Sequence, residues 1–159
     1  MSPALQKWFD NYSADHRDGL NKRIHFVCVP LIFFSVLGLA SLAGINLGTG
    51  QDSTQVRITL AYLLVLAAFI FYARHSVPLF FGIAVFSFIC LLAIDRILNQ
   101  NVFPAWAVFT VIFVAAWIGQ FMGHKHEGKK PSFLTDLVFL LIGPAWILGF
   151  IYRKLGIKF

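Results

Sequence analysis

The chain has 159 residues, of which 58% are hydrophobic and 13% are charged, and its mean hydropathy is +0.76. This balance excludes an ordinary soluble globular protein and indicates an integral membrane protein, and the length predicts one transmembrane helical domain over residues 1–159. The formal net charge of +6 does not indicate a nucleic-acid partner, because Lys and Arg flank the apolar runs, where they set topology and contact anionic lipid.

Before the first apolar run, residues Pro3 to Tyr12 predict a short amphipathic helix. Leu5, Trp8, Phe9 and Tyr12 recur at the i, i+3, i+4, i+7 spacing, which places the four side chains on one helical face. We expect this helix to lie on the membrane or to pack against the helical bundle.

The first membrane span is expected to start near Asn21, which would act as N-cap after the Asp18-Gly19 pair. Pro30 lies well inside the apolar run and predicts either a kink or a helix that begins only near the proline. The stretch from Gly44 to Gly50 is expected to end this span.

Three further spans and a last apolar segment follow. The spans are expected from Ile58 to about Tyr72, from Ser76 to Asp95-Arg96, and from about Pro104 to about Met122. The last segment runs from about Leu134 to Tyr152, and the Gly143-Pro144 pair at its centre predicts an interruption.

The predicted fold class is therefore all-α: an integral membrane helical bundle with four full spans, a fifth spanning or re-entrant helix, and the N-terminal amphipathic helix. The positive-inside rule places the N-terminus and the basic loop after the fourth span in the cytoplasm. A re-entrant fifth helix is favoured, because it keeps Arg153, Lys154 and Lys158 on that side as well. The expected membrane is the inner membrane in a bacterium or the endoplasmic reticulum in a eukaryote.

Histidines are the most informative polar residues of the chain, because imidazole beside a membrane span usually marks a functional site. Under the predicted topology all five lie on the cytoplasmic side, and histidine is the commonest metal ligand. Nothing near His75 in the sequence supplies a partner, which favours an ordinary surface residue there. The five are His16, His25, His75, His124 and His126.

A polar island from Gly123 to Pro131 follows the fourth predicted span and is called the second polar island; spacing within it narrows the set of candidate ligands. His124 and Glu127 are three residues apart, so on a helix they share one face and could bind one ion, or one could orient the other. His126 is about 200° away from His124 around such a helix and would point elsewhere.

The first polar island lies near the N-terminus, with His16 and His25 just before the first apolar run, and can supply two more ligands. On one continuous helix His16 and His25 would lie on opposite faces, but a break at Asp18-Gly19 lets the chain bring them together. Asn21 lies one turn before His25 and Tyr12 one turn before His16, so each could orient the imidazole that follows it.

A three-histidine site with open positions suits iron(II) or zinc. In a small membrane protein its substrate is expected to be a lipid that enters from the bilayer, on which iron would activate dioxygen and zinc would favour hydrolysis. A cysteine-ligated site is excluded, because Cys28 and Cys90 have no Cys-x-x-Cys spacing. Buried free thiols are favoured over a disulfide between them.

Two motifs at opposite ends of the chain carry a resemblance. The first is Tyr12-x3-His16-x4-Asn21-x3-His25 with Val29-Pro30-Leu31-Ile32, and the second is Gln120-Phe121-x-Gly123-His124-x2-Glu127-Gly128-Lys129-x-Pro131 with Leu141-Ile142-Gly143-Pro144. Together they span nearly the whole chain. They resemble the signatures of the small 2-hydroxy fatty acid dioxygenase-like membrane proteins, a family with a fungal phytosphingosine-degradation enzyme and bacterial relatives.

The resemblance implies an iron(II)-dependent membrane dioxygenase that shortens a 2-hydroxy fatty acid by one carbon (α-oxidation), with consumption of dioxygen and release of carbon dioxide. Matched residue by residue, it implies that His16, His25 and His124 are catalytic residues and iron ligands. Glu127 matches an acidic motif position and is expected to act in catalysis, as a fourth ligand or as a partner that orients one.

For the fatty acid itself, we expect the 2-hydroxyl and carboxylate to chelate the iron before the bond between the first two carbons is broken. Asn21, Arg23 and Lys129 are the expected substrate-binding residues, with Arg23 or Lys129 steadying the carboxylate. His75 and His126 match no motif position and are assigned no role.

Other classes of protein remain open on these residues. One is a non-catalytic haem-binding or electron-transfer bundle in which His25 and His124 are the axial ligands. A zinc-dependent lipid hydrolase is a second, and a lipid-binding bundle or small transporter is a third.

Overall fold

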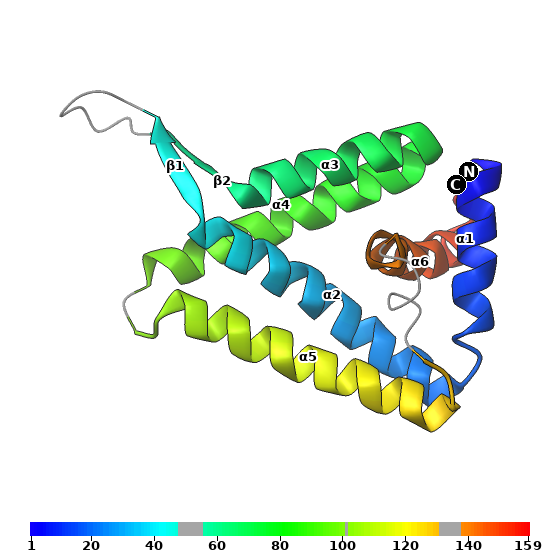
Figure 1. Cartoon of the computed structure of the whole chain (residues 1–159). Helices are drawn as coiled ribbons and strands as arrows, with labels where there is room; N and C mark the ends of the chain where they lie inside the picture. The colour runs from blue at the N-terminus through cyan, green and yellow to red at the C-terminus, as the bar shows by residue number, and fades with distance from the viewer. Residues whose placement is uncertain (48–55, 101, 131–137) are drawn as a thin grey trace.

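The computed structural model describes residues 1–47, 56–100, 102–130 and 138–159, which contain six helices and one two-stranded hairpin (Figure 1). In chain order these elements are α1 (Pro3–Ala14), α2 (Gly19–Leu42), β1 (Gly44–Leu47), β2 (Val56–Thr59), α3 (Leu60–His75), α4 (Val77–Asn99), α5 (Ala105–Glu127) and α6 (Phe139–Lys154).

Three helices, α2, α4 and α5, are long and apolar enough to cross a membrane. Helix α3 is apolar but has only 16 residues, about 24 Å at 1.5 Å per residue, which is short of a hydrocarbon core about 30 Å thick. The helices fit a multi-pass membrane protein, as predicted. The fourth full span is not confirmed, and the crossing or re-entry of the fifth segment stays a prediction.

The outer surfaces of α4 and α5 carry large apolar side chains that no other part of the described chain covers. In water, exposed apolar side chains of this kind would favour aggregation, whereas lipid tails can cover them without a free-energy cost. The side chains that are 61% to 67% exposed on these two helices include Phe81, Val85, Phe88, Val111, Trp106 and Met122.

Helix α2 packs along α5 in the most extensive helix–helix contact of the described chain. Helices α3 and α4 lie side by side and contact α2, and α1 packs against α6 (Figure 1). Helix α6 also contacts α2 and α4. This arrangement brings the start of α2 beside the end of α5, although more than a hundred residues separate them in the chain.

The start of the first span differs from the prediction. Asp18, and not Asn21, is the N-cap of α2, because its Oδ1 atom accepts a hydrogen bond of 2.8 Å from the backbone N–H of Asn21. Gly19 is the first residue of the helix, and the helix continues through Pro30. A start delayed to the proline is therefore wrong.

The C-terminal half also differs. Helix α5 runs past the predicted end at Met122 and stops at Glu127, where Gly128 adopts the left-handed conformation with φ 73°. The second polar island is thus helical as far as Glu127. Helix α6 is continuous through Gly143-Pro144, so the predicted interruption is wrong. Its predicted start at Leu134 lies outside the described residues.

A short antiparallel hairpin was not predicted. Strand β1 pairs with β2 in a register that sets Gly44 opposite Thr59. Because Ile58 belongs to β2, the helix of the second predicted span begins later than expected, at Leu60. Alternating β-branched residues favour a strand here, and the apolar run concealed that signal. Helix α4, in turn, continues past Asp95-Arg96 to its end at Asn99.

Two apolar clusters hold the helices together. One joins α1, α3, α4 and α6, with Val29 of α2, around Tyr72 and Trp146, and the other joins α2 to α3, α4 and α5. The indole N–H of Trp146 donates to Ser13 Oγ at 2.8 Å, which fixes the end of α1 on α6. Cys28 is half-buried, Cys90 is buried, and both are free thiols, as predicted.

Candidate metal centre

Three histidines from distant parts of the chain lie together in a buried cluster. His16 comes from the loop after α1, His25 from the second turn of α2, and His124 from the last turn of α5. Their exposed fractions are 1%, 1% and 3%, and one potential ligand atom from each lies within 4.8 Å of the other two. The structure thus brings together the three histidines that the sequence predicts as ligands.

The loop between α1 and α2 turns His16 back toward the bundle. The ring of Tyr12 stacks on the imidazole of His16 with centroids 4.0 Å apart and an interplanar angle of 13°. The ring of Trp146 lies 5.5 Å from the same imidazole. These aromatic walls fix the orientation of His16 and exclude water from it.

Hydrogen bonds to backbone carbonyls determine the tautomers of two of these rings. Nδ1 of His16 lies 2.5 Å from the carbonyl of Tyr12, and Nδ1 of His25 lies 2.9 Å from the carbonyl of Asn21. A carbonyl only accepts, so both Nδ1 atoms carry the proton and donate. In the neutral rings, both Nε2 atoms then present lone pairs.

Those two lone pairs face each other. The Nε2 atoms of His16 and His25 are 2.8 Å apart, and neither neutral tautomer leaves a proton to lie between them. A cation between them removes the repulsion. For metal–nitrogen bonds of about 2.1 Å, two neighbouring ligands at right angles are about 3.0 Å apart, close to this separation. The pair therefore fits a metal ion.

His124 completes the donor set. Its Nδ1 atom is buried and has no hydrogen-bond partner in the described part of the chain. A buried ring nitrogen without a partner is costly, and a metal bond would satisfy it. The ring centroid of His124 is 4.9 Å from those of both His16 and His25.

Burial lowers the pKa of His16, although its hydrogen bond to the Tyr12 carbonyl and the charges of Glu127 and Asp15 oppose that shift. His16 is therefore neutral at pH 7. A neutral imidazole is the form that binds a metal ion, so no proton has to leave before the ion enters.

Glu127 lies outside this cluster, and its carboxylate links the segments that carry the three histidines. One carboxylate oxygen accepts from the backbone N–H groups of Arg17 at 2.5 Å and Asp18 at 3.2 Å. The other oxygen accepts from Nδ2 of Asn21 at 2.6 Å. The end of α5 is thereby joined to the loop that carries His16 and to the first turn of α2.

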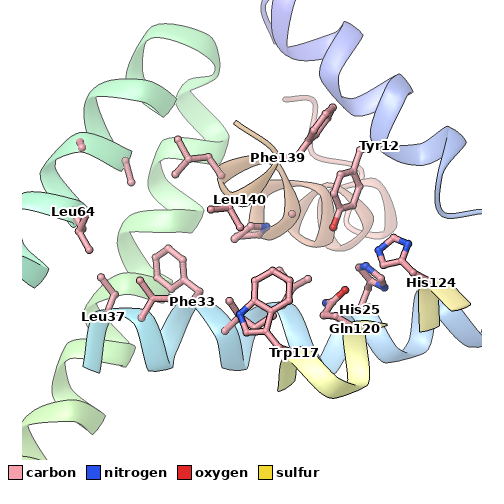
Figure 2. A pocket seen from close by; sticks show the side chains of 18 residues that line it. Tyr12, His25, Phe33, Leu37, Leu64, Trp117, Gln120, His124, Phe139 and Leu140 are labelled. Carbon is pink, nitrogen blue, oxygen red and sulfur yellow. The ribbon is translucent and has the colours of Figure 1, made fainter. Parts of the chain in front are cut away.

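A pocket of about 370 Å³ opens beside the histidines (Figure 2). It lies between α2, α3, α5 and α6, with Tyr12 of α1 at one end, and the described residues that line it include no Lys, Arg, Asp or Glu. Its polar end contains Tyr12, His25, Gln120 and His124. The other lining residues are Val29, Ile32, Phe33, Val36, Leu37, Leu64, Ala67, Ala68, Trp117, Phe139, Leu140, Leu141, Gly143 and Pro144.

The predicted substrate-binding residues are not among the residues that line the pocket. Asn21 is buried and bonded to Glu127, and Arg23 is exposed. Lys129 is exposed, and its Nζ atom is 3.7 Å from Oδ1 of Asp15. A role for these three residues in substrate binding stays a prediction.

The other two histidines lie apart from the cluster. His75 is half-buried, its Nδ1 is 2.7 Å from Oγ of Ser2, and its ring contacts Trp8. The expectation of a surface residue without a partner is therefore wrong. His126 is exposed, with Nε2 3.9 Å from Oδ1 of Asp18, and it points away from His124, as predicted.

Gln120 lines the pocket, although its place in the second motif predicted no role for it. The sequence does mark Gln120 as a candidate, because this polar residue lies inside an apolar helix, one turn before His124. Trp117, Gln120 and His124 follow the i, i+3, i+7 spacing and form one stripe of α5 along the pocket.

Comparison with known proteins gives one match. The family model described as 2-hydroxy-palmitic acid dioxygenase Mpo1-like matches residues 3–155, nearly the whole chain. No curated protein and no solved structure matches the chain significantly. The matched range contains α1 to α6, both polar islands and the histidine cluster. The chain therefore belongs to the 2-hydroxy-palmitic acid dioxygenase Mpo1-like family.

Proposed function

We propose that this protein is an iron(II)-dependent membrane dioxygenase that shortens 2-hydroxy fatty acids by one carbon. The overall reaction consumes one 2-hydroxy acid and one dioxygen, and it yields the fatty acid with one carbon fewer, carbon dioxide and water. The two-carbon end is oxidised by four electrons and dioxygen is reduced by four, so no other reductant is needed. The family description supports a dioxygenase acting on such an acid.

The facing Nε2 atoms of His16 and His25 carry the proposal. Their Nδ1 protons are committed to backbone carbonyls, so their lone pairs converge where a cation is required. With His124 they make an all-nitrogen, three-ligand set that leaves coordination positions open. Iron(II), when bound there, supplies activation of dioxygen.

The residues of the chain then bind, orient and shield. Tyr12 and Trp146 cover the His16 side of the cluster and exclude water. Glu127 keeps the His16 loop on α5. The apolar pocket beside the cluster has the volume of a small-ligand site and suits an acyl chain, with its oxygen-bearing head toward the histidines.

The test combines metal analysis with turnover. We expect protein purified in detergent and loaded anaerobically to hold about one iron per chain, and to consume dioxygen when 2-hydroxypalmitate is added. His16→Ala and His124→Ala should lose the iron and the turnover. His126→Ala is the matched control, because this exposed histidine belongs to the same island and points away from the cluster.

Each other outcome has a distinct meaning. Stoichiometric iron without turnover would support the proposed metal site and refute the proposed substrate. Zinc with lipid hydrolysis would support the hydrolase instead. A strong Soret band in the visible spectrum would replace the proposal with a haem protein. Equal iron content in wild type and both alanine variants would refute the ligand set.

A further inference from the structure

We propose that Gln120 binds the head group of the substrate, with its side-chain amide donating a hydrogen bond to an oxygen of the acid. This inference rests on the proposed function for the place of the metal and deepens it. It assigns recognition of the acid to a neutral donor inside the pocket, where the described lining residues include no cationic side chain.

The N–H groups of the Gln120 side chain have no partner in the part of the chain that the structure describes. The side chain is only 4% exposed, and its Nε2 atom has no hydrogen-bond partner in the described residues. A buried amide N–H without a partner is costly, and it is more so in an apolar helix of a membrane protein. A hydrogen bond from this N–H group to a ligand oxygen would remove the free-energy cost of leaving it unpaired.

The position of Gln120 directs that donor to the metal end of the pocket. Gln120 lies one turn before His124 on the same face of α5, and both line the pocket with His25. Figure 2 shows its side chain beside His25, between Trp117 and His124. An acid whose oxygens reach the histidine cluster therefore passes the amide.

The charges around the pocket favour this neutral donor over a lysine or arginine. Among the basic residues of the polar islands Lys22 is half-buried and the others are exposed, none of them is among the described residues that line the pocket, and Lys129 is paired with Asp15. A metal ion held by neutral imidazoles keeps its full positive charge and neutralises a carboxylate directly. The amide then orients the head, and a second cation is not required.

The remaining lining selects a single acyl chain. Beyond Gln120 the pocket is lined by apolar side chains of four helices, including Phe33, Leu37, Leu64 and Leu140. Leu64 and Leu140 are 39% and 45% exposed, so this end of the pocket reaches the apolar surface of the bundle. The predicted ligand class is a free fatty acid that carries oxygen at the first two carbons.

The experiment measures binding separately from turnover. Radiolabelled 2-hydroxypalmitate is titrated against wild type, Gln120→Met and Gln120→Glu, each anaerobically iron-loaded and metal-free. Gln120→Met keeps the shape and removes the donor, and we expect about tenfold weaker binding in both forms. Gln120→Glu adds a negative charge beside the acid and should weaken binding by more than the Met variant. Iron content should be unchanged in Gln120→Met.

The matched control is Thr110→Val, which removes a polar group from the exposed face of the same helix, away from the pocket. It should bind like wild type. If turnover is present, Gln120→Met should raise KM far more than it lowers kcat, the pattern of lost ground-state binding.

The two proposals fail in distinguishable ways. If wild type binds the acid without turnover and Gln120→Met binds it more weakly, the role of Gln120 is supported and the proposed dioxygenase activity is refuted. If wild type turns over and Gln120→Met binds and turns over equally well, the role of Gln120 is refuted and the activity stands. A wild type that binds no 2-hydroxypalmitate in either form also overturns the inference.

Discussion

Replacement of Glu127 by alanine tests whether this residue positions the proposed metal centre or belongs to it. Its carboxylate joins the end of α5 to Arg17, Asp18 and Asn21 and does not belong to the three-histidine cluster. We therefore expect Glu127→Ala to loosen the loop that carries His16 and to weaken metal binding without abolishing it.

The magnitude follows from what the substitution leaves unpaired. Asn21 is fully buried, and its Nδ2 atom would lose a hydrogen bond of 2.6 Å to a carboxylate, which costs about 1–3 kcal/mol of unfolding free energy. The backbone N–H of Arg17 lies in an exposed residue and would regain water instead. Loss of a residue that supports a ligand typically lowers metal affinity about 10- to 100-fold.

The assay is a metal titration of the purified protein beside its thermal unfolding in the same detergent. His126→Ala serves as the control, because it removes an exposed neighbour one residue away in sequence. Metal affinity and stability that match wild type would refute the positioning role of Glu127. A loss as complete as that of His16→Ala would also refute it and would make Glu127 a ligand.

Three further predictions concern stability and metal binding. Gly123→Ala would place a Cβ 2.4 Å from Oδ1 of Asn21, so it should lower the unfolding free energy by about 1–3 kcal/mol in a denaturation assay, whereas Gly19→Ala, with nothing within 4 Å, should not. Tyr72→Phe removes a hydroxyl that donates to a backbone carbonyl of α6 and should cost about 1 kcal/mol in the same assay; an unchanged midpoint would contradict that. Iron(II) at about 100 times its Kd should stabilise wild type by about 2.7 kcal/mol in a thermal scan and leave His16→Ala unaffected.

Much of this protein could be predicted from local sequence. Long apolar runs between charged pairs identify the membrane helices, because each run must satisfy its own backbone hydrogen bonds in lipid. The same local logic placed His124 and Glu127 on one helical face, and the break after α1 let His16 and His25 converge. Two local predictions failed: Pro144 lies inside a continuous α6, and the N-cap of α2 is Asp18, whose side chain accepts from the backbone N–H of Asn21.

The chemistry of the centre was decided only by tertiary structure. That the Nε2 atoms of His16 and His25 face each other depends on which carbonyl each Nδ1 meets, and spacing alone does not specify this. Two further contacts depend on the packing of α5 along α2. Glu127 accepts hydrogen bonds from the loop that carries His16, and Gln120 lines the pocket with an Nε2 atom that has no partner among the described residues. Such contacts join residues about a hundred positions apart, and a sequence pattern specifies faces of helices but not which faces meet.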